Sequence, residues 1–290
     1  MEKIFKRIAF CDIKNTFFDL SNNEFNTQTR QSILEYTKQG LLFVISTSSP
    51  IYNLDANQNL ILLANQLNSR YIIASNGAEI FDAREEKYLK TTCIDELIIQ
   101  KIIDFSKEFN VKIERSYIKQ YYIDKDEETK NNDCRKNITS LISILCSFDN
   151  CKQIYQKLLN LNLPIEMVIS EKTILITQKN VSIHNSISYL IDILNTDVKN
   201  AMAIAYNDND LIAYSKIAYL YALDDATIPV KNKVTLFSSA SNQNGIGEAI
   251  IDYFYRTRMM AEMAEQYRIK NIKLTKEIKK QTRSNINRKY

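Results

Sequence analysis

Short apolar runs that alternate with helical stretches are the feature that most restricts the fold of this 290-residue chain. The first three runs, each too short for a helix of normal length, cover residues 8–11, 41–47 and 71–75. Helical stretches at 27–40 and 53–68 separate them. Parallel strands that are buried on both faces read as continuous apolar runs. The alternation therefore predicts a doubly wound parallel sheet covered by helices, an α/β fold.

The alternation is interrupted and then resumes. We expect the interruption to contain helices at 94–109 and near Ile138 and Ile154, and strands at 111–117 and 120–123. Strands at 173–177, 201–206, 217–222 and 234–237 then return the chain to the parallel sheet, with helices from His184 and Asn209. This pattern predicts a core domain at 1–82 and 174–255, an inserted α+β cap domain at 83–173, and a helical tail at 256–290.

Two scarce residue types exclude whole classes of site. The four glycines are Gly40, Gly77, Gly245 and Gly247, so the chain contains neither a dinucleotide-binding GxGxxG fingerprint nor a Walker A loop. The one histidine, His184, excludes multi-histidine metal sites. It is either a neutral base at a helix start or a surface residue of that helix.

Polar groups follow three of the predicted strands. Asp12 ends the first strand, Thr47 ends the second, and Asn209 with Asp210 follows the strand at 201–206. Carboxylates and a hydroxyl at one edge of a parallel sheet suit covalent phosphoryl transfer, with a carboxylate nucleophile and acidic groups for a cation. The alternative is structural, because buried strands often end in polar residues.

Five segments, in order and in register, resemble one family. They are FCDIKNTFF, VISTSSP, SNGAEIFD, NVSIHNS and AIAYNDNDL, and SNQNGIGEAI follows near residue 245. Together they are similar to the Cof-type sugar-phosphate phosphatases of subclass IIB in the haloacid dehalogenase (HAD) superfamily. The resemblance covers residues 4–255. It implies a HAD-like core with an α+β cap inserted after the Asn76-Gly77-Ala78 turn.

The resemblance assigns roles that this chain keeps only in part. Asp12 stands at the position of the nucleophile, and Thr47 stands where a hydroxyl holds the phosphate. Lys14 replaces the aspartate that acts as general acid/base, and Ile183 replaces the lysine that neutralises the phosphate. An ammonium group is a poor general acid/base near neutral pH, and isoleucine supplies no charge.

The magnesium site implied by the resemblance is also altered. Tyr206 replaces a ligating aspartate, which leaves Asp12 and Asp210, with Asp208 as a substitute ligand. With one carboxylate fewer and an ammonium group nearby, we expect the metal site to be weak or absent. We therefore expect no cofactor, or Mg²⁺ if the protein is active.

These departures favour one of two functions. The first is a catalytically impaired phosphatase homologue, a pseudoenzyme with a binding or regulatory role. The second is an active Mg²⁺-dependent phosphatase of sugar phosphates or other phosphorylated metabolites, with a rearranged site. In either case the pocket could take a phosphorylated small molecule.

The C-terminal segment supports a further interpretation, a binding module. Residues 256–290 contain 11 Lys and Arg against 3 Asp and Glu, a net charge of +8, whereas residues 1–255 carry −4. Six residues recur at heptad spacing, namely Met260, Ala264, Tyr267, Asn271, Leu274 and Ile278. This pattern suits an RNA or protein partner, or a homodimer, while a solvated helix end is the alternative. No apolar run is long enough for a membrane span, and five scattered cysteines predict a reduced, cytoplasmic protein.

Overall fold

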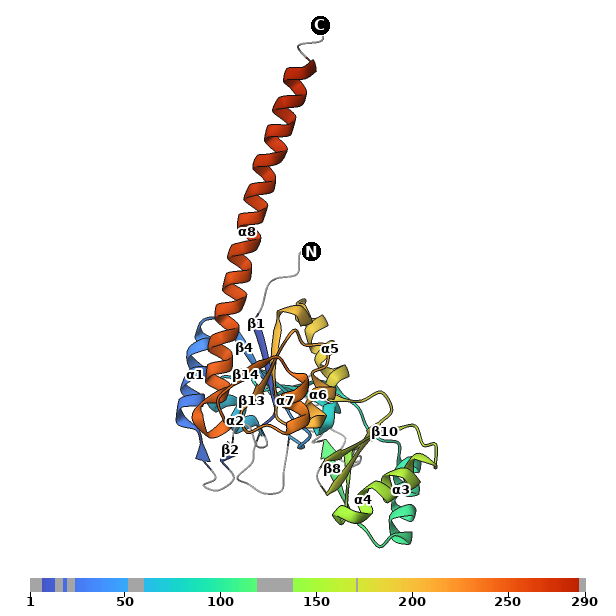
Figure 1. The fold of residues 1–290 in the computed structure, drawn as a ribbon. Helices are drawn as coiled ribbons and strands as arrows, with labels where there is room; N and C mark the ends of the chain where they lie inside the picture. Colours follow the sequence, from blue (N-terminus) through green and yellow to red (C-terminus); the bar gives the residue numbers. More distant parts are fainter. Residues whose placement is uncertain are drawn as a thin grey trace. The chain divides into compact units, whose positions relative to one another are not determined.

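The computed structural model describes residues 7–13, 18–19, 24–51, 60–118, 138–170 and 172–286 (Figure 1). Lys14, the predicted strand at 120–123 and residues 53–59 of the predicted helix lie outside the described residues. The chain divides into two units, Met1–Ala249 and Ile250–Tyr290.

The first unit is built on an eight-stranded sheet with the order β14-β13-β12-β1-β4-β5-β6-β7. Its first five strands, in chain order, are β1 (Arg7–Cys11), β4 (Leu41–Ser46), β5 (Tyr71–Ala74), β6 (Glu79–Asp82) and β7 (Lys87–Thr91). The last three are β12 (Ala201–Ala205), β13 (Tyr219–Leu223) and β14 (Leu236–Ser238). Neighbouring strands from β14 to β5 are parallel, which confirms the α/β fold class. Strands β6 and β7 extend the sheet antiparallel, and the apolar pattern did not predict them.

Helices accompany the parallel strands as the alternation predicted. They are α1 (Thr27–Lys38), α2 (Leu60–Gln66), α5 (Ile183–Ile193), α6 (Asp208–Ala213), α7 (Ile228–Lys233) and the start of α8 (Gly245–Ile286). The sequence marks the start of helix α1, because the Asn26 side chain caps the helix. It accepts hydrogen bonds from the backbone N–H groups of Gln28 and Thr29. The helix ends before Gly40, whose φ of 94° suits glycine.

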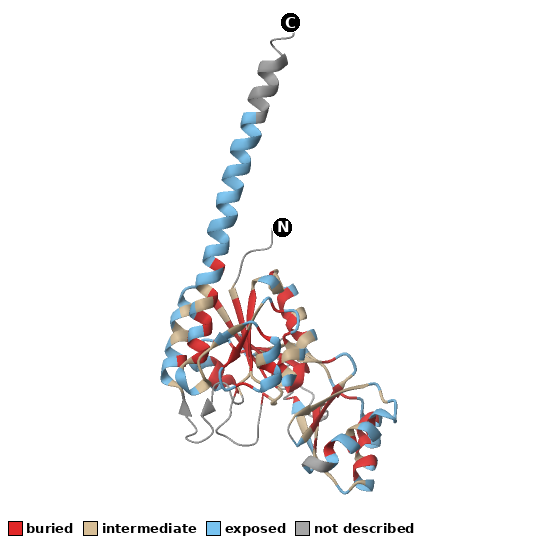
Figure 2. Ribbon diagram, in the orientation of Figure 1, coloured by how far each residue is buried: buried red, intermediate tan, exposed pale blue. Residues whose placement is uncertain are grey.

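Both faces of the parallel sheet are buried, as the red strands of Figure 2 show. On one face, Ile8, Phe10 and Val44 pack in a cluster with Ile187 and Leu190 of α5. The intervening residues of the same strands point to the opposite face and are buried as well, for example Ala9, Cys11, Phe43 and Ile45. This double burial explains why these strands read as unbroken apolar runs.

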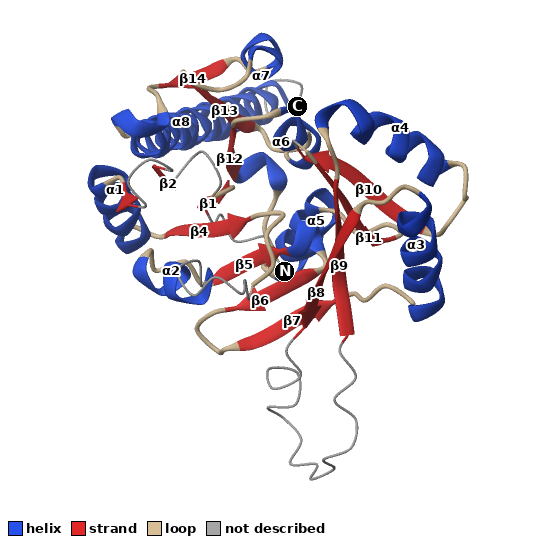
Figure 3. Cartoon of the chain, turned by 90° about the horizontal axis from the view of Figure 1, so that it is seen from below, coloured by secondary structure: helices blue, strands red, loops and turns tan. Residues whose placement is uncertain are grey.

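A second sheet lies in the inserted segment, with the order β10-β11-β9-β8 and antiparallel pairing throughout (Figure 3). Its elements are β8 (Lys112–Ile118), β9 (Ile138–Leu145), β10 (Ile165–Ser170), β11 (Thr173–Gln178), α3 (Glu96–Glu108) and α4 (Phe148–Leu159). Residues of both helices and of strands β9 and β11 share one apolar cluster. The inserted segment therefore has the expected α+β architecture.

Two sequence-based predictions are wrong in this segment. The stretch near Ile138 was expected to be a helix and is strand β9. The strand at 173–177 was expected in the parallel core, yet as β11 it pairs antiparallel with β9 and β10 in the second sheet. Short apolar runs do not distinguish a buried helix from a buried strand, and they do not say which sheet a strand joins. The exact domain boundaries stay a prediction.

Two short strands lie between β1 and α1 in the sequence. Strands β2 (Phe18–Asp19) and β3 (Glu24–Phe25) form an antiparallel pair.

Within the described residues, no helix is long and apolar enough to cross a membrane. Four described cysteines, Cys11, Cys93, Cys146 and Cys151, are not part of a disulfide bond.

Candidate active site

The ends of three adjacent strands place the candidate residues at one edge of the core sheet. Strand β1 pairs in parallel with β4 on one side and with β12 on the other. Cys11, the residue before Asp12, is in register with Ile45 of β4 and Ile204 of β12. The carboxyl ends of these strands therefore lie together, which is where parallel α/β sheets bind ligands.

A cavity of about 80 Å³ lies at this edge, lined by residues of the core and of the second sheet. Asp12, Ile183 and Asp210 line it, so three of the predicted site residues are brought together. The second sheet contributes Val168 and Ser170 from β10 and Leu175 from β11. The remaining lining residues are Ser48, Asn76, Ser182, His184, Asn207, Asn209, Ile212 and Ala213.

Asp210 is the more deeply buried of the two acidic residues. Its Oδ2 atom accepts hydrogen bonds from the backbone N–H groups of Tyr206, at 2.8 Å, and Asn207, at 3.0 Å. Asp210 is also part of a capping box with Asn207 at the start of α6. Burial and the neighbouring charge of Asp12 together raise the pKa of Asp210 to about 7. The two carboxyl groups therefore repel one another when both are ionised.

Asp12 is half-buried, and its Oδ1 atom accepts a hydrogen bond from the Ile13 N–H at 2.6 Å. Ile183 is the first residue of α5 and places an aliphatic side chain against the cavity. The resemblance expects a lysine at this position. Lys14, the predicted substitute for the acid/base, lies outside the described residues.

The other predicted residues lie near the cavity without lining it. Thr47 is buried, and its Oγ1 atom accepts a hydrogen bond from the Ser49 N–H at 3.3 Å, while Ser48 lines the cavity. Tyr206 is half-buried, and burial, followed by the charge of Asp225, raises the pKa of its hydroxyl. Asp208 is exposed and accepts a hydrogen bond from Thr227 Oγ1 at 3.3 Å. Asp208 is thus the exposed first residue of α6 and is not among the residues that line the cavity.

The described residues contribute two carboxylates toward a magnesium site. Mg²⁺ requires near-octahedral oxygen coordination, usually with carboxylates that are available to it. In the described ranges no three acidic, histidine or cysteine side chains come together as a metal-binding group. Asp12 and Asp210 are the two carboxylates at the cavity, and Oδ2 of Asp210 already accepts two backbone hydrogen bonds.

The second sheet is joined to the core beside the cavity. Asn209 Nδ2 donates a hydrogen bond to the carbonyl oxygen of Ile169 in β10, at 2.9 Å. A second junction is formed by Ser140 of β9, whose Oγ atom donates to Glu79 Oε1 in β6, at 2.8 Å. These bonds explain how residues of two sheets come to line one cavity.

The sequence-based list of candidates did not include Asn76 or Glu79. Asn76 lines the cavity with a positive φ of 53°, within a 3₁₀ turn at Ser75–Gly77. The Asn-Gly dipeptide indicates such a turn, but no local pattern indicates where its side chain points. Glu79 is 1% exposed, and burial raises its pKa. Glu79 is the first residue of β6, and the sequence around it gave no signal of its three hydroxyl partners, Ser75, Tyr88 and Ser140.

Comparisons with known proteins identify the family. Residues 9–250 match the family described as haloacid dehalogenase-like hydrolase. The chain belongs to this family. The HAD-like assignment confirms the resemblance drawn from the five sequence segments.

Solved structures of other HAD proteins share the fold. A haloacid dehalogenase-like hydrolase from Bacteroides thetaiotaomicron matches with a TM-score of 0.69 and 17% identity, covering 85% of this chain and 99% of that one. A HAD subclass IIB sugar phosphatase matches with a TM-score of 0.69 and 15% identity, covering 86% and 99%. The protein TM0651 from Thermotoga maritima matches with a TM-score of 0.63 and 19% identity, covering 83% and 95%. The comparison with curated protein sequences gives no match.

The single histidine of this HAD-like chain also lines the cavity. His184 Nδ1 lies 3.3 Å from Ser215 Oγ, and Ser215 donates its hydroxyl proton to the carbonyl oxygen of Ile212, at 3.1 Å. His184 is half-buried and lines the cavity, so it is not a fully exposed residue of the helix surface.

Proposed function

We propose that this HAD-like protein is a catalytically impaired Cof-type phosphatase homologue whose pocket serves binding rather than hydrolysis. The observation that carries the proposal is the lining of the cavity, where aliphatic Ile183 occurs together with two acidic residues, Asp12 and Asp210. A phosphate group carries negative charge, which Asp12 and Asp210 repel and Ile183 does not neutralise. Among its described residues the pocket therefore lacks the lysine or arginine cation that phosphoryl transfer needs.

The missing acid/base supports the same proposal. Proton transfer by a positioned side chain typically raises a reaction rate about 10²–10⁴-fold. In this chain Lys14 stands at the position of the general acid/base.

An active Mg²⁺-dependent phosphatase with a rearranged site is the second candidate. It is favoured by one observation, that Asp12 and Asp210 line the same cavity.

A phosphatase assay separates these candidates. Purified wild type and Asp12→Asn are compared for hydrolysis of p-nitrophenyl phosphate with and without Mg²⁺. We expect the two proteins to give the same low rate, because the charge and proton-transfer groups that activate an aspartate nucleophile are replaced. A Mg²⁺-dependent turnover that Asp12→Asn abolishes contradicts the proposal and favours the active phosphatase.

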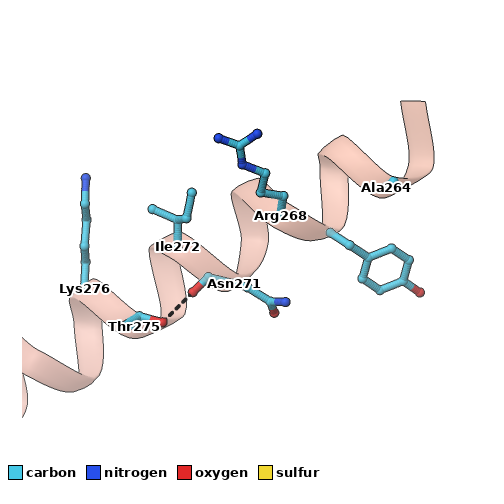
Figure 4. A pocket seen from close by; sticks show the side chains of 7 residues that line it. Ala264, Arg268, Asn271, Ile272, Thr275 and Lys276 are labelled. Atoms are coloured by element: carbon cyan, nitrogen blue, oxygen red, sulfur yellow. Dashed lines mark hydrogen bonds between the residues drawn. The ribbon is translucent and has the colours of Figure 1, made fainter. Parts of the chain in front are cut away.

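We further propose that the second unit provides an interaction site for a protein or RNA partner or for a second copy of the chain. Beyond Arg258, helix α8 exposes large apolar side chains, among them Met260 at 60%, Tyr267 at 64% and Leu274 at 55%. Figure 4 shows Arg268, Ile272 and Lys276 projecting from one side of the helix, with Asn271 on another. Apolar and basic groups are thus both accessible on the same helix.

Removing the exposed part of α8 tests this second proposal. Truncation after Arg258 keeps Tyr253 and Thr257, which are buried. It removes the exposed apolar side chains of α8, called the apolar stripe here, and most of the positive charge of the tail. If the stripe mediates a homodimer, we expect the solution mass by light scattering to fall by half. If the helix binds RNA, retention on an RNA column should be lost, and in the full chain it should weaken steeply with salt. A truncated protein with unchanged mass, RNA retention and co-purifying proteins contradicts the proposal.

A further inference from the structure

Helix α8 has a long exposed segment within the second unit. Every side chain from Arg258 to Glu277 is exposed. Most helices in proteins are stabilised by the packing of an apolar face rather than by helix propensity alone. The ion pairs Arg258–Glu262, at 2.9 Å, and Arg268–Glu265, at 3.7 Å, support the charged side of the segment from within the helix. Its apolar side chains are left in contact with solvent.

Five positions of this segment recur at alternating spacings of four and three residues. They are Met260, Ala264, Tyr267, Asn271 and Leu274, which we call the heptad face. Residues three and four apart lie on the same side of a helix, so the five positions share one side of α8. Met260 is 60% exposed, Tyr267 64% and Leu274 55%. The spacing is that of the core of a coiled coil, with Ala264 and Asn271 at position a and the other three at position d.

The charged residues of the segment avoid the heptad face. Figure 4 shows Arg268, Ile272 and Lys276 in one row along the helix, on a different side from Asn271. Outer positions b, c and f of the heptad hold most of the charges, namely Arg258, Glu262, Glu265, Lys273 and Lys276. The segment can therefore pair along the heptad face without burying a charge.

The charges that flank the heptad face suit a parallel pair of identical helices. Arg268 is at position e and Lys270 is at position g. In a parallel coiled coil, a residue at g lies beside the residue five positions later, at e of the partner. Arg268 then lies beside Met263 of the second copy, and Lys270 lies beside its Thr275, so like charges do not meet.

An antiparallel pair is less suitable for the same sequence. With the greatest overlap of the heptad face, it places Arg268 beside Arg268 and Lys270 beside Lys270, since positions e and g then face their own kind. Like charges that lie side by side repel one another. The same arrangement also sets the Asn271 amide against the ring of Tyr267. The flanking charges thus favour the parallel direction.

Asn271 is the polar residue of the heptad face, and it indicates the kind of partner. A side-chain amide both donates and accepts hydrogen bonds, so two copies of Asn271 in register can bond to each other. A single asparagine at position a specifies register and oligomeric state in coiled coils. On a lipid surface the same amide enters an apolar layer without a partner. Nucleic acid is bound through its phosphate groups, which gives no role to the exposed apolar side chains.

We propose that the exposed part of α8 pairs with the same helix of a second copy of the chain, as a parallel, in-register, two-stranded coiled coil with Asn271 beside Asn271. This inference rests on the proposed interaction site in the second unit and commits that site to one partner. The net charge of +8 in residues 256–290 opposes the pairing, and salt screens this repulsion. The dimer should therefore tighten as salt is raised, whereas binding to RNA weakens.

Sedimentation equilibrium of the full chain at several concentrations tests the pairing. We expect a monomer–dimer equilibrium with a Kd of about 1–100 μM, because the heptad face is short. Leu274→Asp should raise the Kd at least about tenfold, since it places a charge in the core of the coiled coil. Ile272→Asp is the matched control, because it places the same charge on an exposed position in the row of Arg268 and Lys276, and it should leave the Kd unchanged.

Cysteine cross-linking reports the direction and the register of the helices. Ala264→Cys and Leu274→Cys are oxidised separately with copper–phenanthroline, and each should form a disulfide between two chains. A parallel, in-register pair brings both positions together with their own copies, whereas an antiparallel pair brings together at most one of them. Gln266→Cys, at an outer position, is the control for the native cysteines and should give no additional cross-linked dimer.

Four results would overturn the coiled coil. They are a full chain that stays monomeric at about 200 μM, equal effects of Leu274→Asp and Ile272→Asp, cross-linking at fewer than both core positions, and a dimer that weakens as salt is raised.

Failure of this inference and failure of the proposed interaction site give different results. A monomeric full chain whose retention on an RNA column, or whose co-purifying protein, is lost on truncation after Arg258 overturns the coiled coil and leaves the interaction site in place. A truncated protein with unchanged mass, RNA retention and co-purifying proteins contradicts the interaction site, and the coiled coil with it.

Discussion

The triple variant Lys14→Asp, Ile183→Lys, Tyr206→Asp is expected to hydrolyse p-nitrophenyl phosphate at least about 100-fold faster than the wild type in the presence of Mg²⁺. Each change restores a residue type that the resemblance to HAD phosphatases places at that position. The first supplies the general acid/base, the second the cation for the phosphate, and the third a carboxylate for the metal. The effect is large because the three groups act on one reaction step.

Ile183 is the position where the structure supports this expectation most directly. Ile183 lines the cavity that Asp12 and Asp210 also line, so a lysine there would add a positive charge to the same cavity. Attraction between opposite charges near a partly buried site amounts to several kcal/mol at about 4 Å with an effective dielectric of 20. Lys14→Asp and Tyr206→Asp are argued from their positions in the sequence.

Initial rates of the triple variant, of each single variant and of the wild type measure this gain. The triple variant that also carries Asp12→Asn is the control, and it should be as slow as the wild type. If the triple variant gains no activity while remaining folded by circular dichroism, the three positions are not what limits catalysis. The impairment would then have to be sought elsewhere in the chain.

Asp210→Asn is expected to make the protein more stable above pH 7, by up to about 4 kcal/mol in the free energy of unfolding. Burial and the charge of Asp12 raise the pKa of Asp210 to about 7 from an ordinary value of 3.8. A carboxyl group with a raised pKa in the folded state favours folding when it is protonated. Its favourable contribution is present below about pH 3.8 and is lost as the pH rises to about 7. Asparagine at this position avoids the cost of burying a charge.

The substitution also preserves the local hydrogen bonds. An asparagine oxygen can accept from the backbone N–H groups of Tyr206 and Asn207, as Oδ2 of Asp210 does. Helix α6 therefore keeps its N-terminal cap, and the change in stability reports on the buried charge. Asp208→Asn, two residues earlier and exposed, is the matched control and should change stability little.

Urea unfolding between pH 4 and pH 8 measures this effect. The free energy of unfolding of the wild type should decline relative to that of Asp210→Asn as the pH rises, with the two curves separating until about pH 7. Parallel curves for the two proteins, or a wild type that is the more stable at pH 8, would contradict the conclusion that burial and the charge of Asp12 raise the pKa of Asp210.

The sequence predicted the strands and helices of the core because neighbouring residues specify each of them. Strands β1, β4, β5 and β12 are buried on both faces, and each therefore appears as an apolar run that ends in a polar residue. Helix caps such as Asn26 are also local, since a side chain and the N–H groups that it binds are within three residues of each other. The same apolar signal failed at Ile138, where a run of apolar and hydroxyl residues fits a helix or a strand equally well.

The sequence predicted the candidate site only in part, because the orientation of its side chains depends on residues that are far apart in the chain. The sequence placed Asp12, Ile183 and Asp210 at the ends of parallel strands or the start of a helix, and the sheet order brings them to one cavity. The exposure of Asp208 and the place of Asn76 in the cavity lining depend on backbone angles and distant partners. The bond from Ser140 to Glu79 joins residues 61 positions apart. Local periodicity thus determined which strands and helices form, while side-chain packing between the two sheets decided which polar groups face the cavity.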